Sequence, residues 1–163
     1  MLGIDLEAVK DYIHFAEMAK ILFEVQHFAY SVQAQNRPNK KIYCIDNGLR
    51  NVISFRFSED EGKLAENLVF IELVRTGVSP FYWKKKKEVD FVIKSADNNL
   101  VAINVCYTDE IPDREVESLY EFEKEFGKKV KGRIILTKDL EKECEGIVYI
   151  PLWKWLIQEK QIH

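Results

Sequence analysis

Three short apolar segments follow one another between residues 80 and 107, and they restrict the fold more than any other part of the sequence. PFYWK (80–84), EVDFVIK (88–94) and LVAINVCY (100–107) are rich in β-branched and aromatic residues, and the turn-forming stretch SADNN separates the last two. Such residues favour β-strands, and such turns favour chain reversal. The segments therefore predict three consecutive strands of one sheet.

Helical patterns flank these strands. GKLAENLVFIELVRTG (62–77) has apolar residues at a period near 3.6 between two glycines, which predicts a helix with a glycine stop. A charged amphipathic helix is predicted over 114–126, followed by strands at GRIILT and GIVYI and by a last helix that begins at Pro151. Three strands, a helix that crosses back, and further strands predict an α/β fold with a mixed central sheet flanked by helices.

The N-terminal part has a different pattern. Apolar residues at helical spacing predict a helix over 5–21, and two strand-like stretches then surround a polar turn from Gln33 to Asn39. This predicts a β-hairpin whose basic tip carries Arg37, Lys40 and Lys41. A helix followed by a basic hairpin resembles the end of a winged-helix unit and would place these three residues on DNA. The alternative is a solvated hairpin whose lysines only keep it soluble.

A second basic element lies between the first two predicted strands. Lys84 to Lys87 form an unbroken run of four lysines directly after the aromatic residues Phe81, Tyr82 and Trp83. Cations beside aromatic rings suit phosphate contacts with base stacking, so this run is a candidate DNA-binding element. The alternative is a solvated turn whose lysines discourage pairing of the sheet edge.

Composition limits the classes of function. The 163 residues are 47% apolar, which is enough for one ordinary domain, and the formal net charge of −3 argues against a protein that coats DNA with its whole surface. No apolar run approaches the roughly 20 residues that span a bilayer, and we expect a cytoplasmic protein without membrane contact. No GxxxxGK[ST] motif occurs, so this chain should not hydrolyse ATP by that mechanism.

Asp90 is the most informative single residue, because it lies in the interior of a predicted strand. A carboxylate in the middle of VDFVI is costly to bury unless it is paired or holds a metal. The alternative is an ordinary half-exposed strand in which Val89 and Phe91 point inward and Asp90 points to solvent.

Several segments together resemble a known family. KIYCIDNGLRN, GKLAENLVFIEL, YWKKKKEVDFVI, LVAINVCY and IPLWKWL are similar to the C-terminal domain that follows the ATPase core in a large, mainly archaeal and bacterial family of AAA+ ATPases. The resemblance implies a fold like that of PD-(D/E)XK restriction endonucleases over residues 42–163. It also implies that residues 1–41 are a remnant of the winged-helix region that links this domain to the ATPase core.

The resemblance also implies a set of site residues. Glu66 matches the helix acid of the nuclease pattern and Asp90 the strand acid, and these two would hold Mg²⁺ or Mn²⁺. The acid and lysine of the following strand fall on Asn104 and Cys106, which supply neither a negative charge nor an ammonium. Glu88 is the best candidate to replace the missing acid. We therefore expect a degenerate centre with very slow or no nuclease activity.

Three functions remain open from the sequence. The first is a nucleic-acid-binding or regulatory domain of an AAA+ ATPase with an inactive nuclease centre, in which ATP belongs only to a longer parent protein. The second is an active Mg²⁺- or Mn²⁺-dependent endonuclease that uses Glu66, Glu88 and Asp90. The third is an interaction module for the ATPase core, with Trp153 or Trp155 exposed for the contact. The alternative, which the sequence favours for these two rings, is that both pack in the core. The sequence leaves the oligomeric state open.

Overall fold

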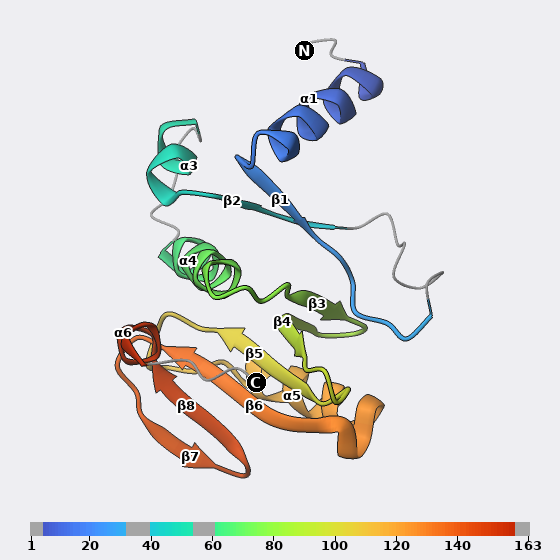
Figure 1. Ribbon diagram of the computed structural model, residues 1–163. Helices are drawn as coiled ribbons and strands as arrows, with labels where there is room; N and C mark the ends of the chain where they lie inside the picture. Colours follow the sequence, from blue (N-terminus) through green and yellow to red (C-terminus); the bar gives the residue numbers. More distant parts are fainter. Residues whose placement is uncertain (1–4, 32–39, 54–60, 159–163) are drawn as a thin grey trace.

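A computed structural model describes residues 5–31, 40–53 and 61–158. Its centre is a six-stranded sheet in the order β3-β4-β5-β6-β8-β7, and a separate two-stranded ribbon is formed by β1 and β2 (Figure 1). The strands are β1 Leu22–Val25, β2 Lys41–Cys44, β3 Phe81–Lys84, β4 Glu88–Lys94, β5 Leu100–Val105, β6 Val130–Thr137, β7 Lys142–Cys144 and β8 Ile147–Pro151. The helices are α1 Leu6–Met18, α3 Asn47–Ile53, α4 Glu61–Arg75, α5 Asp113–Phe126 and α6 Leu152–Ile157, with a 3₁₀ turn at Gly127–Lys129.

The sheet is mixed, as predicted. β3, β4 and β5 form an antiparallel meander, α5 then crosses over to β6 parallel to β5, β8 lies parallel to β6, and β7 pairs antiparallel with β8. The edge strand β7 was not predicted. Its three residues are all exposed and show no apolar alternation, so the sequence contains no strand signal there.

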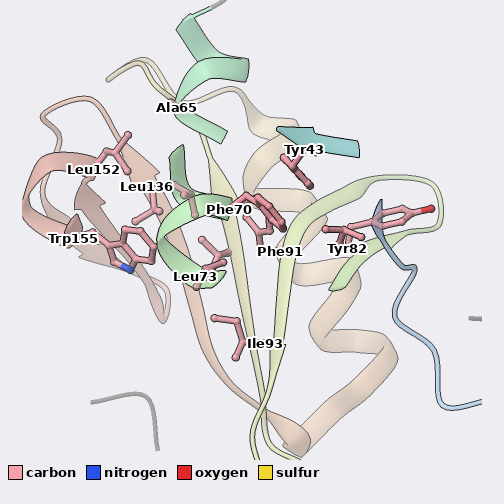
Figure 2. Packing of buried hydrophobic residues seen from close by; sticks show 13 residues of the cluster. Tyr43, Ala65, Phe70, Leu73, Tyr82, Phe91, Ile93, Leu136, Leu152 and Trp155 are labelled. Atoms are coloured by element: carbon pink, nitrogen blue, oxygen red, sulfur yellow. The ribbon is translucent and has the colours of Figure 1, made fainter. Parts of the chain in front are cut away.

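Helices cover both faces of the sheet. Phe91 and Ile93 of β4 pack with Phe70 and Leu73 of α4 and with Trp155 of α6 on one face (Figure 2). Alternate residues of the same strands pack against α5 on the opposite face, where Leu119 and Phe122 are fully buried. Period-2 alternation along the strands therefore divides the apolar residues between two separate clusters.

The β1–β2 ribbon lies across α4 rather than in the main sheet (Figure 1). Phe23 and Tyr43 contact Phe70 of α4, and the ring of Tyr43 stacks on that of Phe70 with centroids 4.5 Å apart. β1 and β2 pair antiparallel, with Leu22 opposite Cys44 and Val25 opposite Lys41, which confirms the predicted pair of strands. The predicted tip, Gln33 to Asn39 with Arg37, lies outside the described residues, and its winged-helix assignment stays a prediction.

Helix α1 stands away from the body of the protein (Figure 1). None of its residues is buried, and Leu6, Tyr12, Phe15 and Met18 are each between 63% and 68% exposed. None of the helices in the described ranges is long and apolar enough to span a membrane.

Candidate functional site

Three carboxylates from two elements meet at one ammonium. Glu66 comes from the first half of α4, and Glu88 and Asp90 come from the start of β4. Lys41, the first residue of β2, places its Nζ 2.9 Å from Glu66 Oε1, 2.8 Å from Glu88 Oε1 and 2.9 Å from Asp90 Oδ1. The structure therefore brings together the three acids that the sequence singled out, with a lysine at their centre.

The acids meet where strands β4 and β5 separate. Paired residues run from Lys94 and Leu100 to Phe91 and Ile103. Beyond that point side chains replace the main-chain ladder: Asp90 Oδ2 accepts from the Val105 N–H at 3.0 Å, and Asn104 Oδ1 accepts from the Asp90 N–H at 3.2 Å. Asp90 therefore has a structural role, because its carboxylate accepts the hydrogen bond of a backbone N–H at the point where β4 and β5 separate (the fork of β4 and β5).

Each acid of the centre has a second partner besides Lys41. The Tyr43 hydroxyl donates to Glu66 Oε1 at 2.6 Å, and Lys84 Nζ lies 2.8 Å from Glu88 Oε2. Burial alone would raise the pKa of Glu88, but the ammoniums of Lys41 and Lys84 hold it below its usual range. Burial raises the pKa of Asp90 to about 6 even though Lys41 acts in the opposite direction.

The ribbon that carries Lys41 is fixed to α4. The side-chain amide of Asn67 is buried and bonds to both backbone groups of Cys44, accepting from its N–H and donating to its carbonyl, each at 2.9 Å. Burial alone would lower the pKa of Lys41, but Asp90 and Glu66 together raise it well above its usual range. Lys41 is therefore held as an ammonium at a fixed position.

The two positions that depart from the nuclease pattern, Asn104 and Cys106, are both buried in the protein. Asn104 is fully buried, and its amide nitrogen lies 2.7 Å from Ser118 Oγ and within 3.0 Å of both the carbonyl and a carboxylate oxygen of Glu115. Burial raises the pKa of the Cys106 thiol to about 11, so the thiol is neutral near pH 7. Neither residue supplies a charge to the centre.

The arrangement does not fit a divalent metal. Glu66 and Asp90 were the expected ligands, but in the described part of the chain no group of three or more His, Cys, Asp or Glu side chains is placed to hold a metal ion. Five of the six oxygens of Glu66, Glu88 and Asp90 already contact Lys41, Lys84, Tyr43 or the Val105 N–H. The ammonium of Lys41 takes the central position instead.

A cleft of about 570 Å³ lies above this centre, between the first turns of α4 and α5 and the turn that joins β3 to β4. Its acidic lining, Glu66, Glu88, Asp90 and Glu115, is half-buried, whereas Lys63, Lys86 and Arg114 are exposed. The cleft thus has an acidic floor and a cationic rim.

The lysine run is largely engaged with neighbouring acids. Lys84 pairs with Glu88, Lys85 with Glu125 and Lys87 with Glu117. Within the described ranges Lys86 is the one member of the run without an acidic partner, and it lines the cleft. Lys40 pairs with Glu24 at the surface. DNA contact by this run and by Arg37, Lys40 and Lys41 stays a prediction. The ammonium of Lys41 already contacts the three carboxylates of the centre.

The sequence reasoning missed the central role of Lys41. It placed Lys41 at an exposed hairpin tip, but side chains alternate along KIYC, so Lys41 shares the inward face with Tyr43. That alternation, together with the aromatic Tyr43, was a usable signal. The partner role of Asn67 carried no comparable signal, because it depends on how α4 meets β2.

Comparisons with known proteins identify a family. Residues 61–155 match the family described as Domain of unknown function (DUF4143). An uncharacterized protein of Methanocaldococcus jannaschii is 31% identical over 167 residues, and one of Haemophilus influenzae is 29% identical over 154 residues. These alignments cover 93% and 92% of this chain but 36% and 37% of the relatives, so the chain spans little more than a third of their length. No solved structure matches the chain.

Proposed function

Since the chain belongs to the DUF4143 family, we propose that it is the nucleic-acid-binding or regulatory domain of an AAA+ ATPase, with an acidic centre that does not hydrolyse phosphodiesters. Domains of this family commonly accompany AAA ATPase domains. The relatives extend well beyond the aligned part, which leaves room for such a core. The fold resemblance to PD-(D/E)XK nucleases and the winged-helix remnant are parts of this proposal.

The observation that supports the proposal best is the cationic rim above a neutralised acidic floor. Four cationic side chains line the cleft (Lys63, Lys86, Lys87 and Arg114), and with Lys41 beneath the floor these five outnumber the four acids, whereas the whole chain carries −3. Phosphate groups bind exposed lysine and arginine side chains through contacts that weaken with salt. Lys63, Lys86 and Arg114 come from three different elements and face one cleft, so a phosphate backbone can bridge them.

The test is the binding of a fluorescently labelled DNA duplex, followed by anisotropy over a range of salt concentrations. A triple variant, Lys63→Gln with Lys86→Gln and Arg114→Gln, should weaken binding and reduce the slope of log affinity against log salt by about 2 to 3. The matched control replaces three exposed lysines outside the cleft by glutamine (Lys131, Lys138 and Lys142). Equal loss in both triples, or no salt-dependent binding by the unmodified chain, would remove the proposal.

Helix α1 supports a second candidate function, docking onto the ATPase core. Four large apolar side chains of α1 are more than 60% exposed, which is unusual for a helix whose apolar face would ordinarily be covered. The remaining part of the M. jannaschii relative, produced as a separate polypeptide, should co-purify with this chain. Tyr12→Ser with Phe15→Ser should abolish that association without changing stability, and unaffected association would exclude α1 as the contact.

A further inference from the structure

We infer that the ammonium of Lys41 is the resident cation of the carboxylate centre, and that the native chain therefore does not take a divalent metal there. Lys41 holds the position between Glu66, Glu88 and Asp90 that a metal ion would need. This inference shares with the proposed function only the position of the centre at the floor of the cleft. The test of the inference measures metal binding and involves no nucleic acid, so the two can fail separately.

The spacing of the acids fits an ammonium. The three carboxylate oxygens lie 2.8 to 2.9 Å from Lys41 Nζ, which is the usual length of a charge-assisted N–H···O hydrogen bond. Mg²⁺ requires oxygens at about 2.0 to 2.1 Å in nearly octahedral geometry. An ammonium has three N–H donors, and the three acids provide one acceptor for each. The centre is therefore complete with Lys41 alone.

The carboxylate oxygens are also committed elsewhere. Asp90 Oδ2 accepts from the Val105 N–H at the fork of β4 and β5, and Glu88 Oε2 contacts Lys84. Bidentate ligation by Asp90 would leave the half-buried Val105 N–H without its acceptor, and a donor left unpaired away from water is unfavourable. Metal entry would thus have to break several satisfied contacts at once.

Lys41 lies on β2, a strand that is fixed against α4 and cannot move away from the centre by itself. Asn67 bonds to both backbone groups of Cys44, three residues further along β2, and the Tyr43 ring stacks on Phe70. The Lys41 side chain is only 20% exposed. A metal that displaced its ammonium would leave this charge half-buried without partners, and an uncompensated buried charge is strongly unfavourable. The ribbon therefore closes the centre to metals permanently.

The experiment measures Mn²⁺ binding by the decrease of the free Mn²⁺ EPR signal. Lys41→Met keeps the unbranched apolar stem as far as Cε and removes the ammonium, and Lys40→Met is the matched control because Lys40 pairs with Glu24 at the surface. We expect that Lys41→Met gains one Mn²⁺ site at least about tenfold tighter than any site of the unmodified chain. The added substitution Asp90→Asn should remove this site, and Lys40→Met should behave like the unmodified chain.

Two results would overturn the inference: one Mn²⁺ bound by the unmodified chain and lost on Asp90→Asn, or a folded Lys41→Met that gains no site. If Lys41→Met does not fold, NMR of the lysine NH₃⁺ groups of the unmodified chain decides. Lys41 should give a slowly exchanging signal that Mn²⁺ leaves unbroadened. Selective broadening of that signal by substoichiometric Mn²⁺ would show that the metal enters the centre.

Discussion

Replacing Lys41 by methionine should destabilise the fold far more than the loss of an ordinary surface charge. The substitution leaves three carboxylates, with side chains 17% to 32% exposed, facing one another without their common cation. Breaking a buried ion pair costs about 3 to 5 kcal/mol, and partial exposure reduces this to about 2 to 4 kcal/mol here. That loss is a large part of a typical free energy of unfolding of about 5 to 15 kcal/mol.

The assay is urea unfolding at pH 7.5 and pH 5.5, with Lys40→Met as the control. Lys40 and Glu24 form an exposed pair, so the control should lose less than about 1 kcal/mol. Lys41 lowers the pKa of Asp90, so without Lys41 that pKa rises further, Asp90 takes up a proton and the loss shrinks at pH 5.5. Similar midpoints for the two variants at pH 7.5, or a loss independent of pH, would show that Lys41 does not stabilise the three carboxylates.

Three further predictions concern the site and its surroundings. Asn104→Asp restores the acid of the nuclease pattern but places a buried carboxylate against that of Glu115. Urea unfolding should therefore show that the free energy of unfolding falls by about 2 to 4 kcal/mol. No Asp90-dependent plasmid cleavage should appear. Burial raises the pKa of Asp90 to about 6, so the stabilisation of the fold by protonated Asp90 is fully present below about pH 3.8 and is lost as the pH rises through 6. The difference in unfolding free energy between the unmodified chain and Asp90→Asn should therefore fall over that range. A difference that does not change with pH would show that burial does not raise this pKa. Trp155→Ala should cost about 3 to 5 kcal/mol by thermal or urea unfolding, whereas Trp153→Ala, at a 56% exposed position, should cost less than about 1 kcal/mol.

The sheet and its helices could be predicted because their signals are local. Apolar alternation in EVDFVIK and LVAINV and the glycine stop after α5 led to the observed elements. Core packing of both tryptophans of PLWKWL, which the sequence favoured, is wrong for Trp153, because Trp153 is 56% exposed whereas Trp155 is buried. The strand β7 was missed because exposed charged residues become a strand there only by pairing with β8.

The candidate site was predicted only in part, because part of it depends on long-range packing. Glu66, Glu88 and Asp90 could be singled out from the strand pattern and the family resemblance. The position of Lys41 depends on the docking of β2 against α4, which is fixed by Asn67 and Phe70 from a segment more than 20 residues away. The alternation along KIYC indicates that Lys41 points inward with Tyr43, but no sequence pattern identifies the acids of α4 and β4 that its ammonium contacts.

Whether Lys41 closes the carboxylate centre to metals is best tested by cleavage of supercoiled plasmid by the purified chain with Mn²⁺ and with Mg²⁺, beside Asp90→Asn prepared identically. If Lys41 closes the carboxylate centre, both proteins should show the same background nicking with either metal. Nicking or linearisation by the unmodified chain that disappears in Asp90→Asn would mean that the centre binds metal and hydrolyses DNA, and that Lys41 does not close it.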